Sequence, residues 1–418
     1  MALPSMSISR FSNLMLIFIL ANLLAACIES RFITGNQVEI DAGKYSRDHS
    51  IVRLPAIPGL KRNALLALQH PDNGHLTPVQ WNEEGEGFFI LDEPLGHGQK
   101  RTYRLVKPDK KAAGGFKVES RDGDLIASAN EKNVLTYHMG TQHPPSGNPD
   151  FYRRSGYIDP LYNPAGQALT DGFPLGHMHQ HALFFAYTNT TYRDSFTDFW
   201  NQHLQKATVA FEKLEKTETG PVFAGFTTRQ IHSSNHFGPV LKEEWQVASF
   251  QPADYYVTDL QTTQNIIGNY PLRINEYHYG GLGIRGSAEW NESDTLRFTN
   301  PMLVLTSEGI RDREKANHSR PRWTAVYGKI NGKWAGLAVL DHPDNFRHPT
   351  PIRVHPDMPY FSVSPMVLGV YSLDPGQTYR MKYRIIAFEG EPDADLLEKL
   401  WRDYAEPVRA KWMTVNKN

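Results

Sequence analysis

The chain has 418 residues, of which 40% are hydrophobic and 21% are charged. This is the composition of an ordinary globular protein, and it excludes a disordered, collagenous or polytopic membrane protein. The 44 Lys and Arg residues nearly balance the 45 Asp and Glu residues. The chain therefore has no net positive charge that would attract nucleic acid, and we expect no nucleic-acid partner. The single cysteine excludes an internal disulfide, and the 17 histidines are many for a chain with little other metal-ligand chemistry.

The N-terminal residues have the pattern of an export signal. Arg10 is the basic flank, and the apolar run from Leu14 to Leu24 is shorter than the roughly 20 residues that span a bilayer. The run ends Leu-Ala-Ala-Cys at Cys27, which resembles a bacterial lipobox, so we expect cleavage before Cys27 and lipid attachment to its thiol. A plain secretory signal that contains a cysteine is the alternative. Ile28 in the next position favours the outer membrane of a Gram-negative cell.

Composition and turn signals divide the chain into four segments. Residues 1–26 are the expected lipoprotein signal peptide, and residues 27–107 form a small N-terminal β region that ends at a polar, glycine-containing linker. Residues 108–390 form one large β domain, and residues 391–418 a C-terminal helix and tail.

Strand-like runs follow one another along most of the chain. In the N-terminal β region they are residues 37–41, 50–54, 87–91 and 101–105. In the large domain they are residues 183–187, 222–228, 241–247, 255–263, 323–327, 334–340 and 379–388. Many of these runs alternate, as antiparallel strands with one solvated face do. The sequence therefore predicts an all-β fold, a large antiparallel two-sheet β-sandwich, closed by an amphipathic helix from Pro392 to Trp412.

The first candidate cluster is a group of closely spaced histidines, His177, His179 and His181, near Asp171. If they continue the strand at residues 183–187, their alternate spacing places all three rings on one face, where they suit one metal ion or several polar groups of one ligand. Metal binding at His177 and His179 stays open, because no third carboxylate stands at a diagnostic spacing. The alternative is that one histidine bonds within the core and the others are solvated.

The second candidate cluster combines a carboxylate with an imidazole. Glu276 and His278 are two residues apart and share a face if they lie on a strand, and this pairing suits general acid–base chemistry on hydroxyls. Arg285 follows, as an ion-pairing or charge-stabilising group. The alternative for Glu276 is a surface salt bridge to Arg273 or Arg285.

The third candidate cluster is a loop after a hydrophobic strand. It is dense in hydrogen-bonding side chains and stiffened by prolines, which suits recognition of a polyhydroxylated or anionic ligand. Its candidate ligand-binding residues are Asp341, His342, Asn345, Arg347 and His348. The alternative is a structural loop in which Asp and Asn side chains cap turns.

Several long motifs in register give the chain a family resemblance over about residues 115–390. They are Arg154–Gly166, Leu169–Pro174, His177-x-His179, His278–Arg285 and Asp341–Pro351. In this order they resemble the bacterial family named after methane oxygenase PmoA, whose members appear mainly in glycan-degrading bacteria. The resemblance implies the large β-sandwich of galactose mutarotase and many polysaccharide lyases, in which His and Glu side chains on the concave sheet act on a sugar.

Our leading hypothesis is a lipid-anchored enzyme of glycan catabolism. His177 and His179 orient or protonate a sugar oxygen, and Glu276, tuned by His278, is the general base. Asp171, His181, Arg285 and the loop residues of the third cluster bind the saccharide. Glycosidic hydrolysis, elimination from an oxidised sugar and epimerisation all stay open, because they are distinguished by distances between groups remote in the chain.

Two other functions are compatible with the same residues. A non-catalytic, surface glycan-binding lipoprotein predicts that Glu276 and His177 lie apart or face solvent, whereas the enzyme predicts that they converge on one pocket. A metal-dependent oxygenase, which the family name suggests, predicts stoichiometric Fe, Cu or Zn in protein purified without chelator.

Overall fold

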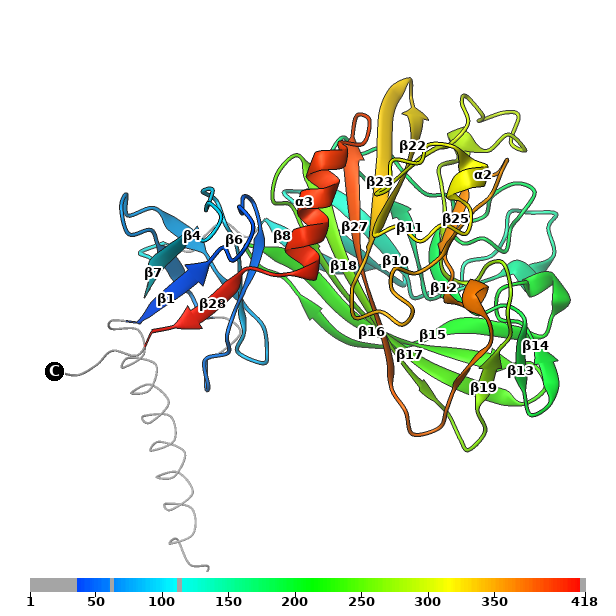
Figure 1. Cartoon of the computed structure of the whole chain (residues 1–418). Helices are drawn as coiled ribbons and strands as arrows, with labels where there is room; N and C mark the ends of the chain where they lie inside the picture. Colours follow the sequence, from blue (N-terminus) through cyan, green and yellow to red (C-terminus); the bar gives the residue numbers. More distant parts are fainter. Residues whose placement is uncertain (1–35, 61–63, 111–114, 414–418) are drawn as a thin grey trace, which may run out of the picture. The chain divides into compact units, whose positions relative to one another are not determined.

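The computed structural model describes residues 36–60, 64–110 and 115–413 (Figure 1). The expected signal peptide and Cys27 lie outside these residues, so export and lipid attachment stay predictions. In the described part of the chain, no helix is long and apolar enough to cross a membrane. The described residues form two compact units: residues 36–110 with residues 408–413, and residues 115–407.

The first unit contains two antiparallel sheets. The larger sheet has the spatial order β28 (Arg409–Trp412), β1 (Gln37–Asp41), β7 (Lys100–Val106), β3 (Ala67–Gln69) and β4 (Leu76–Pro78). The smaller sheet has the order β2 (Ile51–Leu54), β6 (Gly87–Ile90) and β5 (Gln80–Trp81). An apolar cluster of its own, which includes Ile40, Phe89 and Tyr103, fills this unit. The predicted N-terminal β region therefore has its own core, which the last strand of the chain completes.

The C-terminal helix is shorter than the sequence predicts. Helix α3 covers Ala394–Ala405, and the end of the predicted span Pro392–Trp412 forms β28 instead. Pro407 explains this correction, because proline lacks an N–H donor and disfavours a helical conformation in the residue before it. At the start of α3, the Asp393 carboxylate accepts two backbone N–H bonds from the first turn.

The second unit is a β-sandwich of two eight-stranded antiparallel sheets. We call the first the long-strand sheet; its order is β15 (Ala207–Glu218), β16 (Phe223–Ser234), β17 (Gly238–Phe250), β18 (Tyr255–Ile266), β27 (Tyr379–Glu389), β23 (Lys333–Asp341), β22 (Trp323–Ile330) and β21 (Leu303–Thr306). We call the second the short-strand sheet; its order is β24 (Ile352–Val354), β25 (Tyr360–Val363), β20 (Gly281–Arg285), β12 (Leu183–Ala186), β11 (Tyr157–Leu161), β10 (Lys132–His138), β9 (Asp124–Ala129) and β8 (Phe116–Arg121). The predicted all-β sandwich with a small N-terminal β region and a C-terminal helix is confirmed.

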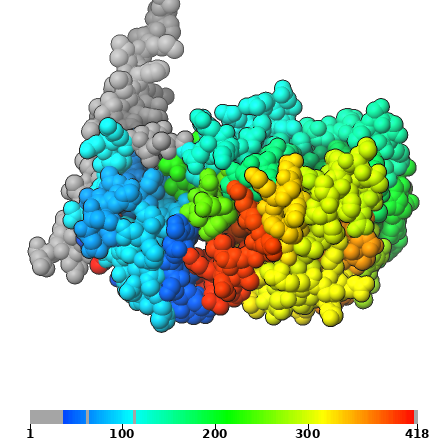
Figure 2. All heavy atoms as spheres, turned by 90° about the horizontal axis from the view of Figure 1, so that it is seen from above, coloured from blue at the N-terminus to red at the C-terminus, as the bar shows by residue number. Residues whose placement is uncertain are grey.

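Smaller elements surround the sandwich. A four-stranded sheet has the order β14 (Ser195–Thr197), β13 (Thr190–Tyr192), β19 (Leu272–Ile274) and β26 (Tyr371–Leu373). The short helices are η1 (Asp150–Tyr152), η2 (Gln202–Leu204), η3 (Ala288–Trp290), η4 (Pro365–Leu368) and α2 (Arg313–Ala316). On the surface of the second unit, yellow segments from the later part of the chain lie beside cyan and green segments from its earlier part (Figure 2). Residues remote in sequence thus meet on this surface.

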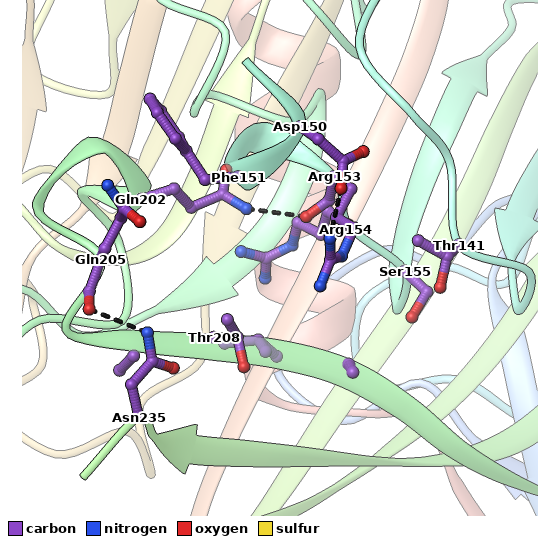
Figure 3. Close-up of a pocket in the computed structure, with 13 residues that line it drawn as sticks. Thr141, Asp150, Phe151, Arg153, Arg154, Ser155, Gln202, Gln205, Thr208 and Asn235 are labelled. Carbon is purple, nitrogen blue, oxygen red and sulfur yellow. Dashed lines mark hydrogen bonds and ion pairs between the residues drawn. The ribbon is translucent and has the colours of Figure 1, made fainter.

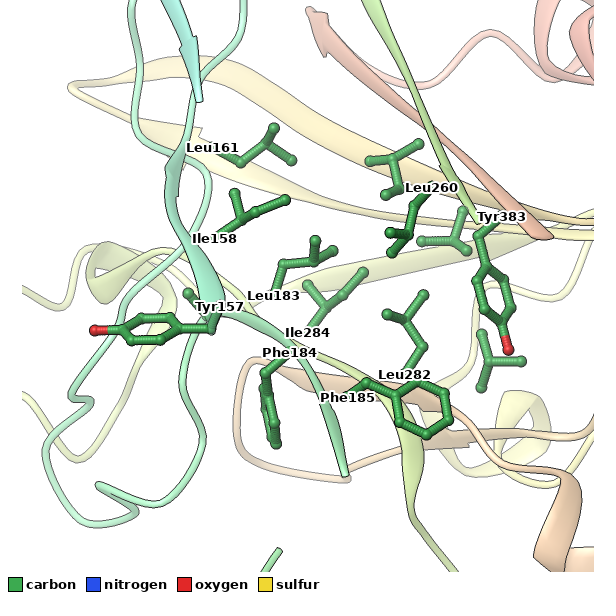
Figure 4. Close-up of a cluster of buried hydrophobic side chains, with 14 of the residues drawn as sticks. Tyr157, Ile158, Leu161, Leu183, Phe184, Phe185, Leu260, Leu282, Ile284 and Tyr383 are labelled. Carbon is green, nitrogen blue, oxygen red and sulfur yellow. The ribbon is translucent and has the colours of Figure 1, made fainter. Parts of the chain in front are cut away.

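The two sheets of the second unit pack face to face around one apolar core. Alternate residues of β12 and β20 point into it, and the long-strand sheet adds residues from the other side (Figure 4). The labelled core residues include Leu183, Phe185, Leu282 and Ile284 from the short-strand sheet and Leu260 and Tyr383 from the long-strand sheet. The sequence pattern predicts strands at β12, β18 and β27, but it does not predict the buried strand β20.

The opposite, outer face of the short-strand sheet is also covered. Tyr157 and Ile158 leave β11 on opposite sides of the strand (Figure 4). On the outer face, Phe184 pairs with Gly283, and the Trp200 ring packs on Phe184 with 4.4 Å between ring centroids. A Cβ atom on Gly283 would lie 2.5 Å from the Trp200 ring, so only glycine permits this approach. Side chains on the outer face of the short-strand sheet near Trp200 are therefore buried.

We predict that Gly283→Ala lowers the free energy of unfolding by about 1–3 kcal/mol, because the added methyl group overlaps the Trp200 and Phe184 rings. Gly140→Ala is the matched control, since its Cβ would meet no atom closer than 3.6 Å. Chemical denaturation of both variants measures the difference. Equal denaturation midpoints would contradict the packing described for the outer face.

Candidate functional site

The segment that carries the first histidine cluster is a loop. Residues 172–182 form turns, and β12 begins only after them. The prediction that His177, His179 and His181 share one strand face is therefore wrong. Gly176, which lies in one of these turns, has a φ of +89°, a left-handed conformation that glycine adopts without strain.

Two of these histidines meet a third from another element. The ring centroids of His177 and His179 are 5.7 Å apart, and those of His179 and His203 are 5.6 Å apart. His203 belongs to η2, and sequence reasoning gave it no role because no local motif surrounds it. We call His177, His179 and His203 the histidine cluster.

His181 lies in the core and does not join this cluster. Its Nδ1 is 3.0 Å from the carbonyl oxygen of Gly172, and its Nε2 is 2.6 Å from Oε1 of Gln202. Burial lowers its pKa well below the ordinary value of histidine. Because both ring nitrogens have protein partners, the predicted contact of His181 with substrate is wrong. Its bonds fasten the loop to η2.

Arg285 lies fully buried at the end of β20, on the outer face of the short-strand sheet. Its Nη1 donates to Oε1 of Gln180 at 2.8 Å, but its Nε and Nη2 have no hydrogen-bond partner. Burial lowers the pKa of Arg285 to about 10, while the charge of Asp171 acts in the opposite direction. Buried donors without partners are rare in folded proteins, so this guanidinium is placed to bind oxygen atoms of a ligand.

Two groups close to Arg285 have unpaired atoms as well. Oδ2 of Asp171 lies 3.6 Å from Nη2 of Arg297 but accepts no hydrogen bond, and Nδ1 of His177 has no partner. Burial raises the pKa of Asp171, and the charges of Arg297 and Arg285 partly oppose this shift. The site thus offers unpaired donors together with an unpaired acceptor, and a hydroxyl group, which both donates and accepts, satisfies such a set.

Two imidazoles of the histidine cluster, those of His177 and His179, are held in their neutral form. Burial lowers the pKa of His177, and the charge of Arg285 acts in the same direction. Burial lowers the pKa of His179 to about 3, with further contributions from His177, His203 and Arg285. Neutral imidazoles accept protons, so this part of the site is suited to general base catalysis.

Asp159 of β11 is a functional candidate that sequence reasoning missed. Its Oδ1 accepts a hydrogen bond from Oγ1 of Thr170 at 2.9 Å. Burial raises its pKa to about 7; the Thr170 bond lowers it and the charge of Asp171 raises it. A carboxyl group that retains its proton near neutral pH is suited to general acid catalysis. The residue lies inside the Arg154–Gly166 motif, but its burial has no sequence signal.

Glu276 and His278 lie on an irregular segment between β19 and β20. The Glu276 side chain is exposed, and its carbonyl oxygen accepts a hydrogen bond from Nδ2 of Asn189 at 3.2 Å. The His278 ring packs on Tyr277 with 4.4 Å between centroids, and burial followed by the charge of Arg353 lowers its pKa. No bond joins Glu276 to His278 in the described residues. The predicted strand pairing of a general base with its tuning histidine is therefore wrong.

The third predicted cluster is a structural loop built around Asp341, the last residue of β23. Its Oδ1 accepts from Nδ2 of Asn345 at 2.7 Å, and its Oδ2 accepts from the His348 ring and from the backbone N–H of Thr350, both at 2.8 Å. The side chains of Asp341, Asn345 and His348 thus bond to one another, as in the structural-loop alternative, and substrate binding by them stays a prediction.

The remaining residues of this loop pack against other elements. Nη1 of Arg347 donates to the carbonyl oxygens of Pro365 and Gly369, both at 2.7 Å. The His342 ring lies 4.9 Å from the Tyr404 ring of α3, and burial lowers the pKa of His342. These contacts are internal, so Arg347 and His342 hold the loop in place, and ligand contacts of either residue stay a prediction.

A metal at His177 and His179 would need a third ligand from elsewhere. In the described ranges, no group of three or more His, Cys, Asp or Glu side chains is arranged to hold a metal ion. The contacts among His177, His179 and His203 are ring contacts, with 5.7 Å and 5.6 Å between centroids.

The model of a family of unknown function, DUF6807, matches residues 124–402. This range contains the histidine cluster, Arg285, Asp171 and Asp159. The match does not test the resemblance to the family named after PmoA. No curated protein matches the chain.

The chain is similar to several solved structures, three of which illustrate the likeness. A protein in glycosyl hydrolase family 38 from Enterococcus faecalis is 10% identical with a TM-score of 0.46, over 91% of this chain and 47% of that chain. An alpha-mannosidase from Enterococcus faecalis V583 is 10% identical with a TM-score of 0.44, over 91% and 46%. A galactose mutarotase related enzyme from Lactobacillus acidophilus is 8% identical with a TM-score of 0.25, over 66% and 100%. The chain spans about half the length of the first two, and these TM-scores are too low to transfer an activity.

We predict that Asp341→Ala lowers the free energy of unfolding by about 2–4 kcal/mol, because three buried or partly buried donors lose their acceptor. Asp344→Ala removes an exposed carboxylate that pairs with Lys382 and lies 3.6 Å from Nδ1 of His342, and it should cost less than about 1 kcal/mol. Chemical denaturation measures both values. An Asp341→Ala protein of unchanged stability would contradict the structural role of this loop.

The raised pKa of Asp159 predicts a pH-dependent stability. The folded-state pKa of Asp159, about 7, lies above the ordinary value of 3.8. The contribution of this carboxyl group to the free energy of unfolding is therefore fully present below about pH 4 and is lost as the pH rises through 7. Asp159→Asn cannot ionise and should exceed the wild type in stability above pH 7 by roughly 2–4 kcal/mol. Denaturation at about pH 5 and about pH 9 tests this, with the exposed Asp122→Asn as control. The same difference between wild type and Asp159→Asn at both pH values would contradict the shift.

Proposed function

The chain belongs to the family of unknown function DUF6807, and we propose that it is an enzyme that performs acid–base chemistry on a saccharide at the outer face of the short-strand sheet. The observation that carries the proposal is the buried guanidinium of Arg285, whose Nε and Nη2 lack partners close to unpaired atoms of Asp171 and His177. Adjacent hydroxyl groups of a sugar ring supply both donors and acceptors for such a set.

The pKa shifts support distinct roles in this reaction. Asp159, which retains a proton near neutral pH, is the general acid, and the neutral imidazoles of His177 and His179 accept or orient a proton. Arg285 and Asp171 hold the hydroxyl groups of the reacting sugar. Donation of a proton by one group and acceptance by another is common to glycosidic hydrolysis, elimination and epimerisation.

Access to Arg285 requires movement of the loop at residues 172–182. Gln180 of this loop bonds to Nη1 of Arg285, and the free Nε and Nη2 atoms are shielded from solvent. We infer that the incoming sugar displaces the loop and then takes the open hydrogen-bonding positions of Arg285. Loop closure over a bound sugar also excludes water from the proton-transfer groups.

A non-catalytic glycan-binding protein is the second candidate, and the exposed position of Glu276 favours it. A glycan-binding protein would use the same contacts of Arg285 and Asp171 with the sugar, but it would not need a protonated carboxyl group at Asp159. In either case the expected lipid on Cys27 would hold the protein at the cell envelope, where glycans are encountered.

Turnover of a glycan panel distinguishes the two candidates. The purified protein is screened against native, uronate-containing and 3-keto glycans for new reducing ends, unsaturated products and epimers. For the glycan that reacts, His177→Ala and Asp159→Asn should each lower kcat/KM by about 100-fold or more. Glu276→Ala is the control and should stay within about twofold, since its side chain is exposed.

The pH profile provides a second test on the same glycan. Since the general acid must be protonated, kcat/KM should fall as the pH rises above about 7, the pKa of Asp159. Unchanged turnover in both His177→Ala and Asp159→Asn would refute the assigned site. Binding without turnover, abolished by Arg285→Lys, would instead establish the glycan-binding candidate.

A further inference from the structure

A pocket of about 640 Å³ lies beside η2 (Figure 3). The segment before β11, the edge strand β15, η2 and the residue after β16 form its walls. Its volume is within the range of roughly 300–1,000 Å³ that small-molecule pockets have. None of the residues assigned above to catalysis or sugar binding lines it.

The lining has the chemistry of a site for neutral, hydroxyl-rich ligands. Amide and hydroxyl side chains dominate it: Thr141, Ser155, Gln202, Gln205, Thr208 and Asn235. The charge of Arg153 is paired with Asp150, which also bonds to the ring of His143 at 2.7 Å. Phe151 adds a partly buried aromatic ring, and aromatic faces and amides are the groups on which sugar rings stack and hydrogen-bond.

Arg154 places a buried positive charge in the wall of this pocket. It lines the pocket, its side chain is 2% exposed, and Nη2 donates to the carbonyl oxygen of Phe185 at 3.0 Å. Its Nε, however, has no hydrogen-bond partner. Because this Nε atom is itself shielded from solvent, the pocket wall combines a buried positive charge with the amide and hydroxyl groups of the other lining residues.

Helix η2 connects this pocket to the histidine cluster. Nε2 of Gln202 donates to the carbonyl oxygen of Arg153 at 2.9 Å, and its Oε1 lies 2.6 Å from Nε2 of His181. The next residue, His203, lies 5.6 Å from His179 between ring centroids. One turn of helix therefore contributes both to the pocket wall and to the proposed reaction site.

We propose that this pocket is an accessory subsite that binds neutral sugar units of the same glycan whose reacting unit lies at the histidine cluster. The inference rests on the proposed function for the identity of the reacting unit, and on the pocket lining for the subsite itself. The substrate is then an oligosaccharide or polysaccharide, and free monosaccharides are poor substrates because they leave the subsite empty.

Chain-length dependence of binding tests the subsite. Titration calorimetry is carried out with matched disaccharides and hexasaccharides of the cellulose, xylan, mannan and chitin series. In at least one series the hexasaccharide should bind about tenfold or more tightly than the disaccharide. Phe151→Ala and Asn235→Ala should each bring this ratio close to one while leaving disaccharide affinity unchanged. Phe196→Ala, which removes an aromatic side chain that is 49% exposed on β14, is the matched control and should keep the wild-type ratio.

The outcomes separate the subsite from the proposed function. If both pocket variants keep the wild-type ratio, or if no series shows a ratio above one, the subsite is overturned. The proposed function then still stands where His177→Ala abolishes disaccharide binding. If the pocket variants lower the ratio and His177→Ala affects neither ligand, the pocket is a glycan site and the proposed function is overturned. Absence of binding by every member of the panel contradicts both.

Discussion

Burial of charge on the outer face of the short-strand sheet is the constraint on which the candidate site depends. Strands β11, β12 and β20 contact the sandwich core on one face, while Trp200 and the loop at residues 172–182 cover the other. Water therefore does not solvate the charged groups that project from this outer face. The guanidinium of Arg285 keeps two donors without partners, and the carboxyl group of Asp159 is driven toward its neutral form.

This environment reverses the usual order of proton affinity between a carboxyl group and an imidazole. The pKa of Asp159 is raised to about 7 by burial and by the charge of Asp171, whereas the pKa of His179 is lowered to about 3 by burial and by neighbouring positive charge. Near neutral pH the carboxyl group thus retains protons that the imidazole does not bind. In acid–base enzymes, local environments that shift the pKa values of two groups apart determine which group acts as the acid and which as the base.

Most of the fold, but a smaller part of the candidate site, can be predicted from the sequence. Alternation predicts β1 at Gln37–Asp41 to the residue, because a strand with one buried face leaves a period-two pattern. The same pattern does not hold at His181, because residues 172–182 form turns and the His181 ring enters the core. Asp159 had no sequence signal, since its pKa depends on burial and on Asp171. The polar loop at Asp341 was equally ambiguous, because only the structure shows its side chains bonded to one another.

Titration of the Asp159 carboxyl group is the most direct test of this account. Carbon-13 NMR of protein labelled at the aspartate carboxyl groups, with the resonance assigned by its absence in Asp159→Asn, follows this group through the pH range in which the protein stays folded. The account predicts a midpoint near 7 that falls in Asp171→Asn, where the neighbouring negative charge is removed. A midpoint near the ordinary aspartate value of about 4, unchanged by Asp171→Asn, would contradict it.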